Sequence, residues 1–288
     1  MFKKFFIVLF LSCLAVASYY WYANRVELQN LFNKKSNRHQ FVIQQAHTLL
    51  GFNLVDPQQA PPNIRDSVMR GFNLVMYTPF YSPGFSGNQL SCTNCHFCGG
   101  DTIGGKNGGI SLVGVVWEYP RFSKRDGKSI TLQQRIKNCF ERSMNGHAPA
   151  FDSDMMLDII QYLKWISKEV ESIKDIPWLG LPTLASKHTP DPIQGAKDYE
   201  KYCQSCHKKS GDGGGVLGEV EGKTIPPLWG PNSFNSGAGM HTINMLAPFI
   251  YLNMPYQQAS LTEEQALDIA AYIRTQPRPS FNPPPPNP

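Results

Sequence analysis

Beyond residue 40 the sequence has no excess of either charge, since residues 41–288 contain 21 basic and 21 acidic residues. The formal net charge of +5 arises in the first 40 residues, which hold six basic residues and one glutamate. A chain without net positive charge displaces few counterions from a phosphate backbone, so general nucleic-acid binding is excluded. The glycine-rich stretch 99–109 also lacks the lysine and hydroxyl residue that end a phosphate-binding loop, which argues against a nucleotide site.

Near its N-terminus the chain has a long apolar run, residues 5–23, which follows two lysines. These 19 residues, at about 1.5 Å each in a helix, approach the hydrocarbon thickness of a bilayer. Residues 1–23 are therefore expected to be either a signal peptide, cut after Ala17, or a membrane anchor. Both alternatives place the rest of the chain in the periplasm, soluble or anchored to the inner membrane.

Two copies of the motif C-x-x-C-H lie 111 residues apart, one in each half of the chain. In this motif the two thiols form thioethers with the haem vinyl groups, and the adjacent histidine ligates the iron. A single copy also fits a chance match or a redox or zinc pair, but two copies indicate a dihaem c-type cytochrome. The predicted haem-binding residues are Cys92, Cys95, His96, Cys203, Cys206 and His207.

One haem motif in each half of the 288 residues favours two domains of ordinary size. We expect an all-α fold with two tandem cytochrome c-type domains after the N-terminal signal or anchor. Prolines break the region between the domains, and the C-terminus is rich in proline. The predicted boundaries are 40–170 for the first domain, 171–191 for the linker, 192–276 for the second domain and 277–288 for a disordered tail.

Helix punctuation is clearest between Ser129 and Gly146. Thr131 with Gln134 predicts a capping box, and Asn145-Gly146 supplies a C-terminal stop. In the second domain, Gly195 is a small residue on the helix before the haem motif, and Tyr272 lies on the last helix. We expect Gly195 to allow a close approach of Tyr272.

The second iron has a candidate distal ligand in Met254, which precedes Pro255 and lies 47 residues after His207. Class I cytochromes c place a methionine ligand at this point, and its thioether raises the potential of the iron. The alternative, a core methionine, fits Met240 or Met245 better. Pro226-Pro227 resembles the loop whose backbone carbonyl orients the proximal histidine.

The first iron has no Met-Pro at a matching distance, but Cys139 lies 43 residues after His96 in the predicted capped helix. On a regular helix Cys139 shares a face with Arg135, Arg142 and Ser143. A thiolate ligand donates electron density to iron and lowers its potential, while arginines lower the thiol pKa and bind anions. This combination predicts a site with chemistry of its own.

The residues near the first iron also allow two simpler interpretations. Cys139 can be a buried free thiol, and Met144 or His147 can be the distal ligand. The segment 121–142 contains seven basic and two acidic residues in an otherwise neutral protein. A small polyanion is therefore a reasonable substrate class.

Three segments carry a resemblance to a known family: Leu90 to His96, Asn138 to Gly146, and Pro226 to Pro231. They resemble the dihaem thiosulfate dehydrogenases, also called tetrathionate synthases. The first domain of that family is akin to the cysteine-ligated cytochrome of the sulfur-oxidising multienzyme system. The resemblance covers about residues 60–275.

The resemblance implies that two thiosulfates are joined to tetrathionate with release of two electrons, or that the reverse reduction of tetrathionate takes place. It implies two covalent haem c groups and an external redox partner such as a small cytochrome c or a high-potential iron-sulfur protein. The implied ligands are His96 and Cys139 for the first iron, and His207 and Met254 for the second. The implied substrate contacts are Arg125, Arg135, Ser143 and, at a polar position after the first haem motif, Asn107.

Two positions depart from the family pattern, and two other functions compete. Asn253 stands where some members have a lysine, so ligand exchange by that lysine is not available, and Cys98 has no family role. A non-catalytic dihaem electron carrier would have Met144 or His147 on its first iron. A dihaem peroxidase would need an open histidine-ligated iron and would leave the arginines unexplained.

Overall fold

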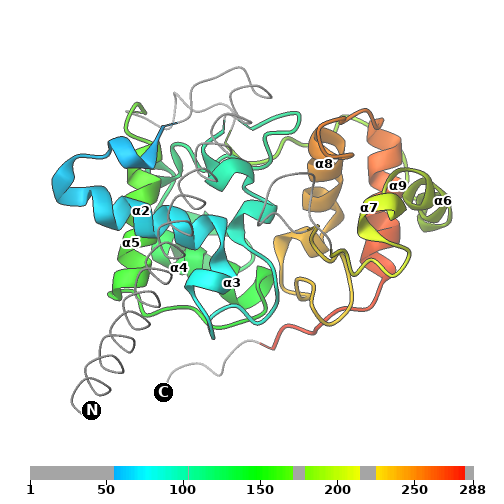
Figure 1. The fold of residues 1–288 in the computed structure, drawn as a ribbon. Coiled ribbons are helices and arrows are strands. Elements are labelled where there is room, and N and C mark those ends of the chain that lie inside the picture. The colour runs from blue at the N-terminus through cyan, green and yellow to red at the C-terminus, as the bar shows by residue number, and fades with distance from the viewer. Residues whose placement is uncertain (1–54, 103, 171–178, 215–224, 283–288) are drawn as a thin grey trace, which may run out of the picture. The chain divides into compact units, whose positions relative to one another are not determined.

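The computed structural model describes residues 55–102, 104–170, 179–214 and 225–282 (Figure 1). All of them belong to one compact unit. The predicted signal or anchor over residues 1–23 therefore lies outside the described residues. Among the described residues, no helix is long and apolar enough to cross a membrane.

The N-terminal half of the described chain, residues 55–170, is built around two packed helices. Its helices are α2 (Pro62–Met76), α3 (Thr78–Tyr81), α4 (Leu132–Asn138) and α5 (Asp154–Ile166), with short turns η1 (Pro57–Gln59), η2 (Cys92–Asn94), η3 (Phe97–Gly100) and η4 (Val115–Trp117). Helix α2 packs against α5. Gly71 makes this possible, because a Cβ there would lie 2.0 Å from the carbonyl oxygen of Asp158.

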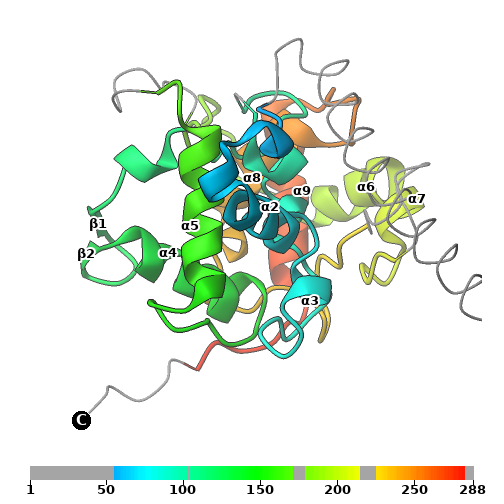
Figure 2. The same ribbon diagram turned by 60° about the vertical axis from the view of Figure 1, so that its left-hand side comes forward.

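A small antiparallel hairpin precedes α4, with β1 (Arg121–Ser123) paired to β2 (Lys128–Ile130). It lies beside α4 at the edge of the N-terminal half (Figure 2). The helix expected from Ser129 therefore starts later, at Leu132, with the Thr131 side chain as its cap. Gln134 donates its backbone N–H to Thr131 Oγ1 at 3.2 Å but does not complete a capping box; its side-chain Nε2 donates to Asn138 Oδ1 at 3.2 Å.

The C-terminal half, residues 179–282, packs three helices around a buried centre. Its elements are α6 (Pro192–Tyr202), α7 (Gln204–His207), η7 (Gly239–His241), α8 (Ile243–Asn253) and α9 (Glu263–Thr275). Both α6 and α8 pack against α9. Gly195 does allow a close approach, but to the backbone of Asp268, whose oxygen would lie 1.9 Å from a Cβ. Tyr272, the partner expected from sequence, packs its ring 5.4 Å from that of Tyr199 on the same helix as Gly195.

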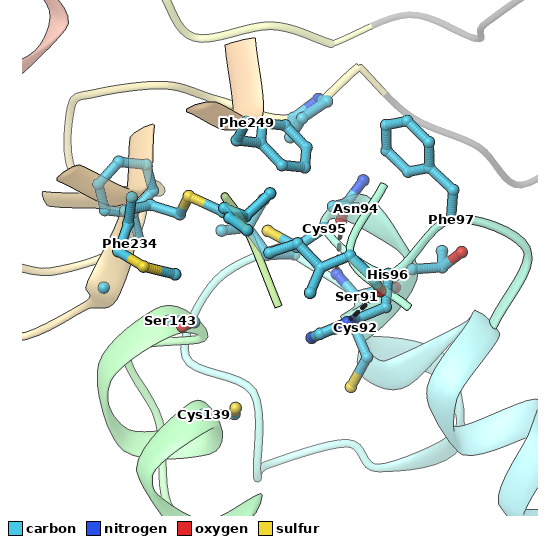
Figure 3. A pocket seen from close by; sticks show the side chains of 18 of the residues that line it. Ser91, Cys92, Asn94, Cys95, His96, Phe97, Cys139, Ser143, Phe234 and Phe249 are labelled. Carbon is cyan, nitrogen blue, oxygen red and sulfur yellow. Dashed lines mark hydrogen bonds between the residues drawn. The ribbon is translucent and has the colours of Figure 1, made fainter. Parts of the chain in front are cut away.

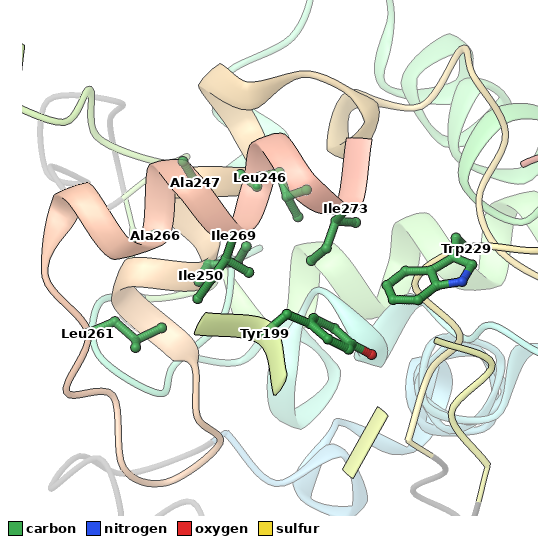
Figure 4. Close-up of a cluster of buried hydrophobic side chains, with 10 residues drawn as sticks. Tyr199, Trp229, Leu246, Ala247, Ile250, Leu261, Ala266, Ile269 and Ile273 are labelled. Carbon is green, nitrogen blue, oxygen red and sulfur yellow. The ribbon is translucent and has the colours of Figure 1, made fainter. Parts of the chain in front are cut away.

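The core of the C-terminal half combines aliphatic residues of α8 and α9 with two aromatic rings (Figure 4). Tyr199 from α6 and Trp229 from the following loop have ring centroids 5.0 Å apart. Ala266, Ile269 and Ala270 of α9 are fully buried against them. Burial of this kind contributes about 25 cal/mol per Å² of apolar surface, so the haem-bearing α7 is held on a well-packed frame.

The two halves are joined by hydrogen bonds from the buried side chain of Asn235. The Asn235 side chain donates to the carbonyl oxygen of Glu141 at 2.8 Å and to Asn145 Oδ1 at 3.0 Å. The segment after α9, expected to be disordered from residue 277, is ordered over residues 277–282. The carbonyls of Pro277 and Pro279 accept hydrogen bonds there from the backbone N–H groups of the preceding loop, which proline-rich composition alone does not reveal.

Candidate functional site

A cavity of about 560 Å³ lies between the two haem motifs. All six residues predicted to bind haem line it: Cys92, Cys95, His96, Cys203, Cys206 and His207. Further walls come from α4, the segment after it, α8 and α9. The cavity is therefore placed and lined as two covalently attached haems require.

The first haem motif forms a tight turn that fixes the histidine ring. The Asn94 side chain accepts from the Ser91 backbone N–H at 2.7 Å, which closes the turn η2. His96 Nδ1 donates to the carbonyl oxygen of Ile110 at 2.8 Å. Burial lowers the pKa of His96 to about 4, so the ring is neutral. With Nδ1 used as a donor, Nε2 is the nitrogen left to bind iron.

The second motif repeats this geometry. His207 Nδ1 donates to the carbonyl oxygen of Pro226 at 3.0 Å, which confirms the role expected for the Pro226-Pro227 loop. Burial lowers the pKa of His207 as well. Met254 lines the cavity directly after the last residue of α8, and Met240 and Met245 line it too. Both histidines thus show the donor arrangement typical of an iron ligand.

Cys139 and Ser143 are the first and last residues of a π-helical turn, η5 (Cys139–Ser143), which continues α4. The Met144 N–H donates to the Cys139 carbonyl oxygen at 3.0 Å, across five residues instead of four. Both side chains line the cavity and face the first haem motif (Figure 3). Such turns occur frequently at functional sites because they re-aim side chains out of the regular helical register.

Arg135 lies one helical turn before Cys139 and lines the same wall. The Cys139 sulfur, when ionised, is the largest influence on the guanidinium and raises the pKa of Arg135. Arg135 also interacts with the hydroxyl of Tyr119, a cavity residue that sequence reasoning missed. Burial raises the pKa of Tyr119, so the phenol stays protonated and can donate a hydrogen bond.

Two more arginines crowd this wall. Arg121 lines the cavity together with Glu118, its ion-pair partner. Arg125 does not line the cavity but lies at its rim: its Nη1 donates to the carbonyl oxygen of Gly237 at 3.2 Å and would lie 3.6 Å from a Cβ on the lining residue Gly239. Partial burial lowers the pKa of both guanidinium groups, and Arg135 lowers it further. Guanidinium groups that lower one another's pKa repel one another, and an anion bound between them offsets this repulsion. The wall is therefore suited to a small anion of high charge.

Arg142 is not on this wall, although a regular helix would place it there. Its Nη2 donates to Asp126 Oδ1 at 2.7 Å, and both side chains are largely buried. The wider π turn changes the direction of residues after Cys139, so Ser143 reaches the cavity while Arg142 points to the β1–β2 turn. The expected shared face of Cys139, Arg142 and Ser143 is thus wrong for Arg142.

Asn107 is not among the residues that line the cavity. Its backbone N–H donates to the carbonyl oxygen of Leu252 at 2.8 Å, at the end of α8. Of the two competing ligands for the first iron, Met144 is buried and lines the cavity, whereas His147 is exposed and does not. The structure therefore brings together Cys139, Arg135 and Ser143, with Arg125 at the rim, and leaves Asn107 at the junction of the two halves.

Two family models match this chain. Residues 85–171 match the SoxA/TsdA cytochrome c domain, and residues 190–273 match cytochrome C oxidase, cbb3-type, subunit III. These matches correspond to the N-terminal and C-terminal halves, each with one haem motif. The chain is thus mostly helical with two cytochrome c domains, and it carries two covalently bound haem c groups with iron.

Named relatives cover most of the chain. It is 40% identical over 221 residues to a thiosulfate dehydrogenase of Allochromatium vinosum, covering 76% of this chain and 81% of the relative. A thiosulfate dehydrogenase of Thiomonas intermedia is 36% identical over 227 residues, covering 77% and 70%. The solved thiosulfate dehydrogenase TsdBA of Marichromatium purpuratum, in its "as isolated" form, has a TM-score of 0.69 at 29% identity over 77% of this chain. This chain spans about half, 48%, of that solved chain. With these identities over most of its length, the chain belongs to the thiosulfate dehydrogenase family of dihaem c-type cytochromes.

Proposed function

We propose that this protein joins two thiosulfate dianions to tetrathionate and releases two electrons. The observation that carries the proposal is the wall of Arg135, Arg121 and Tyr119 beside Cys139, with Arg125 at its rim, facing the first haem motif. Family membership supports the same reaction, because the relatives bear the name thiosulfate dehydrogenase.

Electrostatics explains why such a wall is needed. Two dianions about 5 Å apart repel by about 3 kcal/mol in water and by about 13 kcal/mol at an effective dielectric constant of about 20. Sulfur–sulfur coupling in a partly buried site therefore requires several fixed cations. Arg135 and Arg121 line the wall, Arg125 stands at the rim, and Tyr119 and Ser143 supply hydroxyl donors that bind sulfonate oxygens.

The ligands that we propose for the first iron are His96 and Cys139. Support comes from the neutral His96 ring held by Ile110, and from the position of the Cys139 sulfur opposite the first haem motif. When bound, each haem supplies a one-electron acceptor, so the pair holds the two electrons of one turnover. Cys139 gives the site a soft, electron-rich sulfur close to the substrate sulfur atoms, and Arg135 holds its negative charge in place.

Electrons leave through the C-terminal half, for which we propose His207 and Met254 as the iron ligands. Met254 follows directly on Asn253, whose fully buried side chain fixes the end of α8. The cavity is lined by both haem motifs, which places the two redox centres next to each other. The acceptor is an external one-electron carrier, such as a small cytochrome c or a high-potential iron-sulfur protein.

The site also accommodates the reverse reaction, since a wall that stabilises two adjacent thiosulfates also binds tetrathionate. We place the protein in the periplasm, soluble or anchored to the inner membrane, on the basis of the apolar segment 5–23. Attachment of haem c through two thioethers to each C-x-x-C-H motif fits this location.

The test is thiosulfate-dependent reduction of ferricyanide by the haem-loaded protein, with tetrathionate measured as the product. We expect one tetrathionate for every two electrons. The matched control is the same protein with sulfate, a dianion of similar size that cannot be coupled. If both haems are present and reducible but thiosulfate gives no turnover, the protein is an electron carrier and the proposal fails.

A further inference from the structure

The segment after α9 returns to the N-terminal half (Figure 1). We name residues 277–281 the C-terminal strap. The Pro277 carbonyl accepts from the Gly230 N–H at 2.7 Å, and the Pro279 carbonyl accepts from the Ser236 N–H at 2.9 Å. The Phe281 N–H then donates to Ser236 Oγ at 2.9 Å. Three successive hydrogen bonds thus fix where the Phe281 ring lies.

The Phe281 ring is wedged between Arg142 and Gly237. The Arg142 guanidinium carbon lies 5.0 Å from the ring centroid, a cation–π contact. Gly237 also lies against the ring, since a Cβ added there would lie 2.6 Å from it. Arg142 Nε and Nη1 are buried without a hydrogen-bond partner among the described residues, so the aromatic face is the group that covers this cation.

The two residues that Phe281 contacts hold two neighbouring residues of the β1–β2 turn. The Gly237 carbonyl accepts from Arg125 Nη1 at 3.2 Å. Arg142 Nη2 donates to Asp126 Oδ1 at 2.7 Å. Arg125 is therefore held by Gly237 through its own side chain. Its neighbour in sequence, Asp126, is held by Arg142, and both Gly237 and Arg142 contact Phe281.

We infer that Phe281 is a positioning residue that holds Arg125 at the rim of the thiosulfate site. This inference rests on the proposed function, because it takes Arg125 to be a contact of the anionic substrate. Without the ring, the loop at Gly237 and the Arg142–Asp126 pair both lose their common support. The Arg125 guanidinium then samples more positions, and substrate binding weakens while the chemistry at Cys139 continues.

The first test is Phe281→Ala in the haem-loaded protein. We expect KM for thiosulfate to rise about tenfold with kcat within about twofold, the pattern of lost binding that is equal in ground and transition states. The thiosulfate concentration that half-saturates the change in the haem spectrum should rise equally, which measures binding without turnover. Phe281→Tyr keeps the ring and should restore both values. Ser280→Ala, at the exposed neighbouring position, is the matched control.

A double-mutant cycle gives a sharper test. Gly237 does not have a left-handed φ, and the atoms nearest to an added Cβ all belong to Phe281: two ring carbons at 2.6 Å and the Phe281 Cβ at 2.8 Å. We expect Gly237→Ala to raise KM in the wild-type background and to have no further effect beside Phe281→Gly, which removes both the ring and the Cβ. Additive effects, or an unchanged KM in Phe281→Ala, would overturn the inference.

If the proposed function itself is wrong, the experiments give a different pattern of results. In that case the wild-type protein does not turn over thiosulfate, or Arg125→Ala leaves KM unchanged. If wild-type turnover and the Arg125→Ala effect are both present, the Phe281 and Gly237 variants decide the inference alone. If Phe281→Ala does not fold, two other measurements decide the inference. The first is KM of the Gly237→Ala variant. The second is a spectral titration that compares Phe281→Tyr with Phe281→Leu, because a leucine side chain lacks the ring but retains apolar volume.

Discussion

The Oδ1 atom of Asn253 accepts a hydrogen bond from the backbone N–H of Gly109 at 2.7 Å, deep between the two halves of the chain. The residue after Gly109 is Ile110, whose carbonyl accepts from His96 Nδ1 at 2.8 Å. The residue after Asn253 is Met254, the proposed ligand of the second iron. One short chain of covalent and hydrogen bonds therefore links the environments of the two haems.

Asn253→Ala should destabilise this link. The substitution leaves the buried Gly109 N–H without its acceptor and removes the side-chain hydrogen bond to the Phe249 carbonyl, and an unsatisfied buried polar group costs about 1–3 kcal/mol. We expect the free energy of unfolding in denaturant to fall by this amount. The methionine–iron absorption of the second haem should weaken, since Met254 loses its support. Asn63→Ala, at an exposed position on α2, is the control and should change neither property. If Asn253→Ala and the wild type have the same free energy of unfolding and the same methionine–iron absorption, the hydrogen bond between Asn253 and Gly109 does not support either property.

Arg135→Ala should impair thiosulfate turnover strongly. It removes the guanidinium that neighbours Cys139 and Tyr119, so the repulsion between two dianions is no longer offset. We expect kcat/KM to fall by about 100-fold or more, the usual size for loss of a preorganised charge-stabilising donor. Lys137→Ala is a matched control of equal charge on the same helix, because Lys137 pairs with Glu141. If Arg135→Ala and Lys137→Ala lower kcat/KM by a similarly small factor, Arg135 is not part of the thiosulfate site.

Cys139→Met should raise the midpoint potential of the first haem. A thioether donates less electron density than a thiolate and stabilises the ferrous state, and the substitution also removes the reactive sulfur. Redox titration followed in the visible spectrum measures the potential, and the ferricyanide assay should show loss of turnover. Met144→Leu tests the competing ligand and should leave the potential unchanged. The assignment fails if Cys139→Met retains the wild-type potential and full turnover with both haems intact. Cys98→Ser, at a buried thiol outside the cavity, controls for loss of a cysteine.

Asp101 should make the stability of the protein depend on pH. Burial raises the pKa of this carboxyl group to about 7, although the Val55 N–H donates to it at 2.7 Å. Because the pKa in the folded state exceeds the unfolded value of about 3.9, the folded state binds the proton more tightly. Its contribution to stability is fully present below pH ~4 and is lost as the pH rises through about 7.

The size of that loss is at most ~4 kcal/mol, because the pKa moves from about 3.9 in the unfolded chain to about 7. Asp101→Asn carries no titratable proton at this position, so its free energy of unfolding should vary less between pH 4 and pH 7. Denaturant unfolding of both proteins across this range measures the difference. Parallel pH profiles for the variant and the wild type would show that Asp101 is not the responsible group.

Local signals in the sequence predicted the elements that depend on neighbours along the chain. The two C-x-x-C-H motifs form turns whose histidines donate from Nδ1 to backbone carbonyls, and the Pro226 carbonyl has the role expected for it. Thr131 caps α4 with its side chain. The haem-motif turns and the helix cap depend on hydrogen bonds between residues a few positions apart. The two histidines, in contrast, donate to loops that come later in the chain.

The sequence reasoning failed where a side chain's direction depends on a partner far along the chain. Arg142 leaves the expected face because η5 is a π turn and Asp126 draws its guanidinium away. Tyr119 carries no motif and becomes part of the site only because its loop folds against Arg135.

The sequence by itself therefore determined that this protein holds two haems in two helical domains, because thioether attachment and proximal ligation need only five consecutive residues each. Only the tertiary structure decided which cations surround Cys139, and that residues 277–281 return to the N-terminal half. The physical reason is distance along the chain. Arg125 meets Gly237 and Arg142 meets Phe281 across more than a hundred residues, and such contacts follow from the packing of whole domains, to which local propensity contributes little.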